Sequence, residues 1–215
     1  MGLLAEVEEF AEAEGLAVMG VVPQGAAPMP EDLRSLVLLG PQGAAFWDGF
    51  TQSPEYRDGQ PDPIDRWSTR IIGAMAESMG AQALFPFGTT PPHPFITWAL
   101  ASGRAFVSPV HLLVHDEAGL WVSYRGALGL REALAAPPPA QSPCIECDKP
   151  CLTACPSSAL TGAGYDLAAC HAFLDRLEGA SCLSGGCAVR AACPLSRSHG
   201  RVPAQSAHHM RYFHP

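Results

Sequence analysis

Cysteine is the residue type in this chain whose number and spacing could do chemistry. All eight cysteines fall between Cys144 and Cys193, and the first 143 residues contain none. Two of them are followed by proline, at Cys155-Pro156 and Cys193-Pro194, and these two endings divide the cysteines into two groups of four. Thiolates at this density bind soft metals or pair as disulfides, so the region predicts a site built from sulfur ligands.

The first group is typical of an iron–sulfur site. The run from Cys144 through Cys147, Cys151 and Cys155 to Pro156 reads C-x2-C-x3-C-x3-C-P, one residue longer in its second gap than the C-x2-C-x2-C-x3-C-P run of bacterial ferredoxins. Three thiolates on a tightly turning loop can bind three corners of one cubane, while the fourth leaves on the next helix and points elsewhere. Eight thiolates are the number that two [4Fe-4S] clusters require. The second group consists of Cys170, Cys182, Cys187 and Cys193.

Disulfide bonds and zinc are the two alternative roles for so many cysteines. Disulfide frameworks belong to secreted chains, and the acidic start of this sequence, with Glu6, Glu8 and Glu9, lacks the basic residues of a signal peptide. Zinc sites usually pair two C-x2-C units or add histidines, whereas this chain has a single C-x2-C and one histidine, His171, beside a cysteine. Both alternatives stay open, zinc above all, because four sulfurs in a tetrahedron can hold either metal.

Composition and charge narrow the class of protein. The 215 residues are 47% hydrophobic, enough for a buried core, and no apolar run reaches the length of a membrane span. The net charge of −8 and the single lysine, Lys149, leave no basic stripe for a nucleic-acid backbone. Free thiols at this density require a reducing compartment or a bound metal. We therefore expect a cytoplasmic protein that binds neither membrane nor nucleic acid.

A proline-rich stretch at 135–143 separates two predicted domains. Its three consecutive prolines have fixed φ angles and make a semi-rigid spacer, so we expect a domain over residues 1–137 and a smaller cysteine-rich module over residues 138–215. In the first domain helical and extended patterns alternate, which predicts an α/β (α+β) fold of sheet and helices. Helices are expected at 3–11, 44–50, 63–79, 94–102 and 166–177, and strands at 16–22, 35–39 and 81–85.

A β-hairpin is the structure predicted for residues 110–124. Two apolar segments, 110–115 and 120–124, flank a turn that contains Gly119. His111 and His115 would then share one face of a strand, because strand side chains alternate between faces. A buried, hydrogen-bonded pair is the interpretation that this spacing favours over a metal site.

The order of the cysteines resembles the cluster region of the epoxyqueuosine reductases over about residues 142–196. That family has a four-cysteine run, one isolated cysteine on a helix and three more cysteines that end in Cys-Pro; the closing three are more widely spaced in this chain. The resemblance implies a dicluster ferredoxin-like module in which the fourth cysteine of each run serves the opposite cluster. One cluster would take Cys144, Cys147, Cys151 and Cys193. The other would take Cys155, Cys170, Cys182 and Cys187.

The first domain resembles the vitamin B12-processing chaperones that are deficient in type C methylmalonic aciduria. The resemblance rests on Pro61-Asp-Pro-Ile-Asp65 at a helix start and on His111 to Gly126, which contains G-x-W-x-x-x-R-G. It implies a nitroreductase-related sheet-and-helix domain that binds a corrinoid such as cobalamin, or a flavin. The sequence shows no counterpart of the reductase's catalytic acid, so no catalytic residue is assigned.

Three residues of the first domain are candidates for contact with such a cofactor. Arg125 stands beside Gly126, which allows a ligand to approach closely, and its guanidinium group suits a phosphate; an arginine in solvent is the alternative. Trp98 could line the binding site of a flavin or corrin; a place in the hydrophobic core is the alternative. His93 lies in a rigid proline-flanked loop that could aim it into a cleft or leave it in solvent.

Together these patterns predict an iron–sulfur electron-transfer protein. Two clusters would pass single electrons to a corrinoid or flavin on the first domain, or to a redox partner protein. Whether the chain is itself an enzyme stays open, since it has neither paired carboxylates nor a G-x-S-x-G motif. An enzymatic role would be that of an iron–sulfur oxidoreductase. The alternative is a non-enzymatic cofactor-binding or chaperone protein with a structural zinc–cysteine module.

Overall fold

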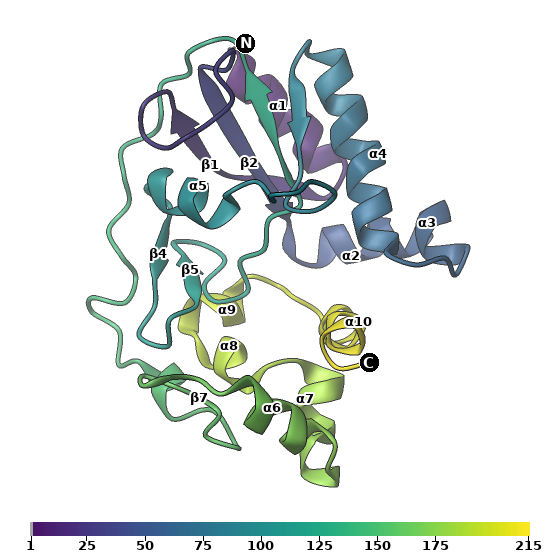
Figure 1. The fold of residues 1–215 in the computed structure, drawn as a ribbon, viewed down its shortest axis with the longest axis vertical. Coiled ribbons are helices and arrows are strands. Elements are labelled where there is room, and N and C mark those ends of the chain that lie inside the picture. The colour runs from purple at the N-terminus through teal and green to yellow at the C-terminus, as the bar shows by residue number, and fades with distance from the viewer. Residues whose placement is uncertain (1) are drawn as a thin grey trace. The chain divides into compact units, whose positions relative to one another are not determined.

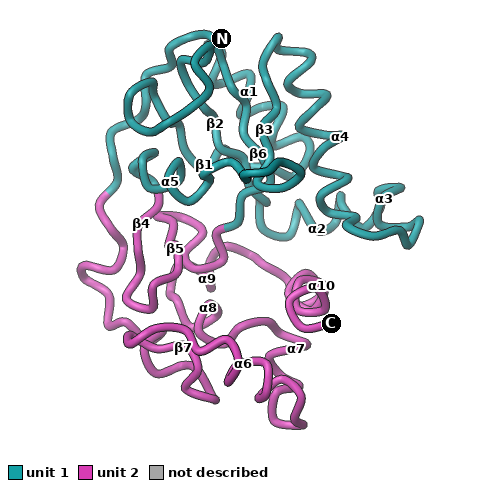
Figure 2. Tube along the Cα trace, in the orientation of Figure 1, with its two compact units in different colours: residues 1–104, 123–140 teal, residues 105–122, 141–215 magenta. Residues whose placement is uncertain are grey.

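The computed structural model describes residues 2–215, which form two compact units (Figure 2). Unit 1 ends at Arg104 and resumes over 123–140, and unit 2 consists of 105–122 and 141–215. The division at 140 lies within the proline-rich stretch, whereas the sequence placed residues 105–122 in the first domain. Their side chains instead join a core of unit 2, to which Val110, Val114 and Leu120 contribute beside Cys151 and Val189. A contact between segments so far apart in the chain leaves no local sequence signal.

Unit 1 contains a four-stranded antiparallel sheet with the strand order β1-β2-β6-β3 (Figure 1). The inner strand β2 is buried along its whole length, as its branched apolar residues require. The three predicted strands are confirmed as β1 (Leu16–Pro23), β2 (Ser35–Pro41) and β3 (Gln82–Leu84). The helices of unit 1 are α1 (Leu3–Ala13), α2 (Gly43–Gln52), α3 (Pro54–Arg57), α4 (Pro63–Ser78) and α5 (Phe95–Ala101). The sequence predicted all of them except α3.

The long helix α4 supplies much of the unit 1 core. Trp67, Ile71 and Met75 recur every four residues, so they share one face of the helix, and all three are buried. The ring of Trp67 meets that of Phe46 edge-on at 5.2 Å between centroids, and Phe50 stacks on Phe46 at 5.7 Å. This aromatic cluster joins α2 to α4.

Strand β6 (Gly126–Leu130) lies between β2 and β3 and was not predicted. Two of its five residues are Gly126 and Gly129, and glycine is a weak strand former. All five are buried, and a β-carbon at position 126 would lie 2.7 Å from Cδ1 of Ile72. The glycines therefore allow close packing against this strand, which only the folded structure reveals.

Unit 2 consists of short elements joined by loops. Its strands pair as β4 (Ala105–Val107) with β5 (Leu113–His115), and as β7 (Leu160–Thr161) with β8 (Gly164–Tyr165). The predicted helix at 166–177 corresponds to α6 (Leu167–Leu174), whose N-cap Asp166 accepts the N–H of Ala169 at 2.9 Å. The remaining elements are the 3-10 helices η1 (Pro150–Leu152) and η2 (Leu177–Gly179) and the helices α7 (Ala180–Gly185), α8 (Ala188–Ala192), α9 (Pro194–Ser198) and α10 (Pro203–Phe213). None of the helices that the structure describes is both long and apolar enough to cross a membrane.

The predicted hairpin over 110–124 is wrong. Strand β5 pairs with β4, and residues 120–124 form no strand. The chain reverses at 108–112, where His111 adopts a left-handed conformation with φ +60° that ends any extended run. His111 is therefore exposed in a turn, whereas His115 is fully buried in β5, and the two share no strand face.

Candidate functional site

Four of the eight thiols line one cavity of unit 2. Cys144 and Cys147 lie in the loop that leads into η1, Cys151 lies in η1, and Cys193 is the residue before α9. The cavity has a volume of about 530 Å³. These are the four cysteines that the resemblance to the epoxyqueuosine reductases implies for one cluster. We call them the first cysteine set.

The loop turns sharply between Cys147 and Cys151. Lys149 takes a left-handed conformation there, with φ +55° and ψ +48°, and Pro150 then starts η1. The backbone N–H of Lys149 donates to Sγ of Cys147 at 3.3 Å. This turn lies in the second gap of the motif, where the chain has one residue more than bacterial ferredoxins, and it brings Cys151 back to the cavity that Cys147 lines.

The thiols of the first set lie close enough to affect each other's ionisation. Burial raises the pKa of Cys144, and the neighbouring Cys147, Cys151 and Cys193 raise it further. Burial likewise raises the pKa of Cys151, with added contributions from Cys147 and Cys193. Cys144 and Cys151 therefore resist deprotonation, and a bound cation would compensate the negative charge on their thiolates.

The other four thiols form a second cysteine set in unit 2. Cys155 follows η1, Cys170 lies in α6, Cys182 lies in α7 and Cys187 is the N-cap of α8. Burial raises the pKa of Cys182, and Cys187, Cys155 and Cys170 raise it further. Cys182 is therefore near the three other cysteines that the resemblance implies for the second cluster.

Polar groups contact sulfur in the second set. The hydroxyl of Tyr165 donates to Sγ of Cys170 at 3.4 Å. Burial and this bond raise the pKa of Tyr165 well above its ordinary value, so the hydroxyl keeps its proton. Burial opposes ionisation of Cys155, but hydrogen bonds from Ser157 and from nearby backbone N–H groups outweigh burial and lower its pKa. The second set therefore contains groups that stabilise negative charge on two of its sulfurs.

The donor atoms fit two four-iron clusters in number and chemistry. Each set supplies four thiols, and all eight are free of disulfide bonds. Over residues 2–215, no three His, Cys, Asp or Glu side chains lie close enough to hold a single metal ion. In a cubane each thiolate binds a different iron, so its four ligands need not meet at one point.

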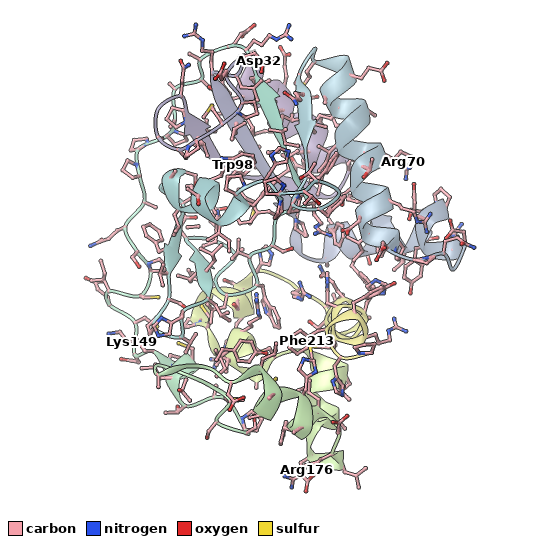
Figure 3. All side chains as sticks on the ribbon, viewed as in Figure 1. Asp32, Arg70, Trp98, Lys149, Arg176 and Phe213 are labelled. Atoms are coloured by element: carbon pink, nitrogen blue, oxygen red, sulfur yellow. The ribbon has the colours of Figure 1, made fainter. Side chains whose placement is uncertain are left out.

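The three candidate cofactor residues of unit 1 all contact other side chains of that unit. Trp98 is 1% exposed, and its Nε1–H donates to the carbonyl oxygen of Pro28 at 2.6 Å, so in this structure it packs the core (Figure 3). The imidazole of His93 stacks on Trp98 at 5.6 Å between ring centroids. Arg125 is half-buried, and its Nη1 pairs with Oδ1 of Asp65 at 3.1 Å. Contact of Arg125 or His93 with a cofactor stays a prediction.

Two histidines singled out in the sequence serve the structure of unit 2 separately. Nδ1 of His115 accepts the backbone N–H of Glu117 at 3.1 Å, so this buried ring organises the loop after β5. Nε2 of His111 lies 3.0 Å from the carbonyl oxygen of Gly162 and joins the turn at 108–112 to the β7–β8 hairpin.

Two largely buried arginines of unit 2, Arg190 and Arg201, were missed by sequence reasoning. Nη1 of Arg190 donates to the carbonyl oxygen of Leu120 at 2.7 Å, and burial lowers its pKa, although neighbouring Cys187 partly offsets this. The guanidinium of Arg201 lies 4.7 Å above the ring of Trp121, and burial lowers its pKa to about 10. The position of Arg190 three residues after Cys187 was the one local signal that could have indicated that the two lie close together.

Comparison with known proteins leaves the site to be interpreted from its own geometry. No protein-family model matches the chain, and no curated protein matches it.

Proposed function

We propose that this chain is an iron–sulfur electron-transfer protein that holds two [4Fe-4S] clusters. The observation that supports this best is the division of the thiols into two sets of four, one of which lines a single cavity. Each set combines cysteines from both of the groups that end in Cys-Pro. Such a division matches the ligand exchange of two-cluster ferredoxins.

The proposed roles of the residues follow from their surroundings. A four-iron cluster gains or loses one electron at a time, and its potential depends on burial and on hydrogen bonds to its sulfur ligands. Cys151 and Cys182 are buried and would shield the two clusters from water. The Lys149 N–H at Cys147 and the Tyr165 hydroxyl at Cys170 would stabilise charge on sulfur.

The other reactant in this proposal is a redox partner protein, or a corrinoid or flavin bound by unit 1. Either would exchange single electrons with the clusters, and no residue of the chain needs to transfer a proton. The proposal leaves the catalytic step, where there is one, to the partner or cofactor.

Anaerobic purification of the full chain tests the proposal. We expect brown protein with about eight iron and eight acid-labile sulfide per chain, four of each for every cluster. Reduction with dithionite should bleach the visible absorption and produce the paramagnetic signal of reduced clusters. Colourless protein that contains zinc and no sulfide would overturn the proposal in favour of a structural zinc module.

A further inference from the structure

Arg190 is a cation withdrawn from water beside the second cysteine set. It lies in α8, whose N-cap is Cys187, and residues three apart on a helix share a face. Cys187 and Tyr165 act on it electrostatically, and so does a second buried cation, Arg201, whose pKa Arg190 lowers. Within residues 2–215 no carboxylate forms a salt bridge with Arg190. A cation in this position requires a negative partner, because desolvating a charge without one is costly.

Tyr165 adds a second group that stabilises negative charge in the same set. Its hydroxyl donates to Sγ of Cys170 at 3.4 Å, from strand β8. Arg190 and Tyr165 thus act on two different sulfurs of the second set, Cys187 and Cys170. Arg190 itself is held in place by its 2.7 Å hydrogen bond to the carbonyl oxygen of Leu120.

The charged residues around the first set differ from Arg190 because they are exposed to water. Its cavity is lined by two acidic residues, Glu146 and Asp148, and by two basic ones, Lys149 and Arg197. All four are exposed, so their charges balance and are screened by water. A charge in surroundings with an effective dielectric constant of about 20 acts roughly four times more strongly than one in bulk water. The partly buried Arg190 therefore has no equivalent at the first set.

We propose that Arg190 is the internal counter-cation of the second set and, together with Tyr165, gives a cluster held there a higher reduction potential than one held by the first set. This inference rests on the proposed iron–sulfur function. Reduction adds one negative charge to a cluster and its thiolates, so a nearby cation favours the reduced form. Electrons would then run from the first set to the second.

The transfer balances without bond changes. With clusters bound, a one-electron donor of the reduced flavin or reduced ferredoxin class would lose one electron at the first set. An oxidised cofactor or protein would gain one electron at the second set. No proton moves in any of these steps.

Potentiometric titration of the anaerobic full-length protein, followed by electron paramagnetic resonance, tests the assignment. Two backgrounds isolate the clusters, because Cys144→Ala should keep only the second and Cys170→Ala only the first. We expect Arg190→Gln to lower the midpoint potential in the Cys144→Ala background and to leave it unchanged in the Cys170→Ala background. Tyr165→Phe should lower the same potential by a smaller amount, and Arg190→Lys should restore most of it.

The control is Arg176→Gln, which removes an exposed arginine of unit 2 that pairs with Glu178 (Figure 3). It should leave both potentials unchanged. Loss of half the iron in Arg190→Gln, with full iron in Arg190→Lys, would also support a counter-cation. Equal shifts in both backgrounds, or no shift with iron intact, would overturn the inference. Wild-type protein without iron and sulfide would instead overturn the proposed function.

Discussion

Gly119 leaves the space in which the Cys193 thiol lies. A β-carbon at position 119 would stand 3.0 Å from Sγ of Cys193 and 2.6 Å from the backbone nitrogen of Ser196, and Gly119 itself has φ +59°. The loop after β5 therefore packs directly on the start of α9. This contact fixes the one cysteine of the first set that the loop at 144–151 does not supply.

Replacing Gly119 by alanine should displace Cys193. We expect Gly119→Ala to destabilise unit 2 by about 1–3 kcal/mol, the usual cost of overpacking, and to lower the iron content by up to half. Gly59→Ala is the matched control, because Gly59 has φ +68° but open space around its α-carbon. Urea unfolding and iron analysis measure both effects. Equal losses in the two variants would attribute the effect to backbone strain alone.

Double cysteine variants should reveal the exchanged ligation. Cys144→Ala alone is expected to remove one cluster, and therefore about half the iron. Adding Cys193→Ala should remove no more, because both belong to the first set, whereas adding Cys155→Ala should remove the rest. The opposite pattern would show that each cysteine run holds its own cluster. Complete loss from Cys144→Ala alone would show that the module folds only around both clusters.

The ion pair between Arg70 and Glu55 should make the stability of unit 1 depend on pH. Arg70 donates to both carboxylate oxygens of Glu55, at 2.5 and 3.0 Å, and these bonds lower the pKa of Glu55. The pair stabilises the fold fully above the ordinary glutamate pKa of about 4.3 and loses this effect as pH falls through the lowered value. Glu55→Gln should lower the free energy of unfolding by about 1 kcal/mol at pH 7. It should also weaken the decrease of that free energy at acid pH. Urea unfolding followed by tryptophan fluorescence measures this free energy, and Glu8→Gln, at an exposed position, is the control.

His208 should give unit 2 a different pH dependence. The side chain is 5% exposed, and burial, assisted by Arg211, lowers its pKa to about 4. The unfolded chain therefore takes up a proton first, so stability should fall as pH decreases from about 6.5 to 4, by at most roughly 3 kcal/mol. Circular dichroism in urea should show this slope in the wild type. It should become shallower in His208→Gln, where His199, whose pKa burial also lowers, still contributes, and it should persist in His111→Gln. A slope unchanged in His208→Gln would contradict the assignment.

Two substitutions at one ion pair distinguish whether Arg125 contacts a cofactor or only supports the fold by pairing with Asp65. Arg125→Met and Asp65→Asn both break the pair at 3.1 Å, but only the first removes the guanidinium group. Titration with cobalamin and with flavin mononucleotide, followed by visible absorption, measures binding. If Arg125 contacts the cofactor, affinity should fall at least tenfold in Arg125→Met, the effect of about 1.4 kcal/mol, and stay unchanged in Asp65→Asn. Equal losses would show that the pair only supports the fold.

Local patterns were sufficient for much of the fold. The apolar runs at 16–22 and 35–39 predicted β1 and β2, and the periodic apolar residues of 63–79 predicted α4, because burial follows residue spacing within one element. The loop from Cys144 to Cys151 is local in the same sense. Its spacing alone indicated that three thiols could share a site.

Long-range packing decided the rest. Strand β6 contains Gly126 and Gly129. Because these residues have no side chain, Ile72 and Leu33 from distant segments can pack closely against the strand. The segment 105–122 joins unit 2 through core contacts that its own sequence does not encode. The hairpin prediction failed because the chain turns earlier, at 108–112, so that β5 pairs with β4 and residues 120–124 form no strand.

For the site itself, residue order was enough to predict the number of thiols, their two Cys-Pro endings and the separation of a cysteine-free first part from a cysteine-rich second part. The groups that surround each set became known only from the folded structure. Tyr165 donates to Cys170, Arg190 is held by the carbonyl oxygen of Leu120, and Gly119 makes room for Cys193, each through a contact between different elements. Spacing along a chain governs neighbours within one turn or strand, whereas burial, counter-charge and steric fit depend on segments that meet only after folding.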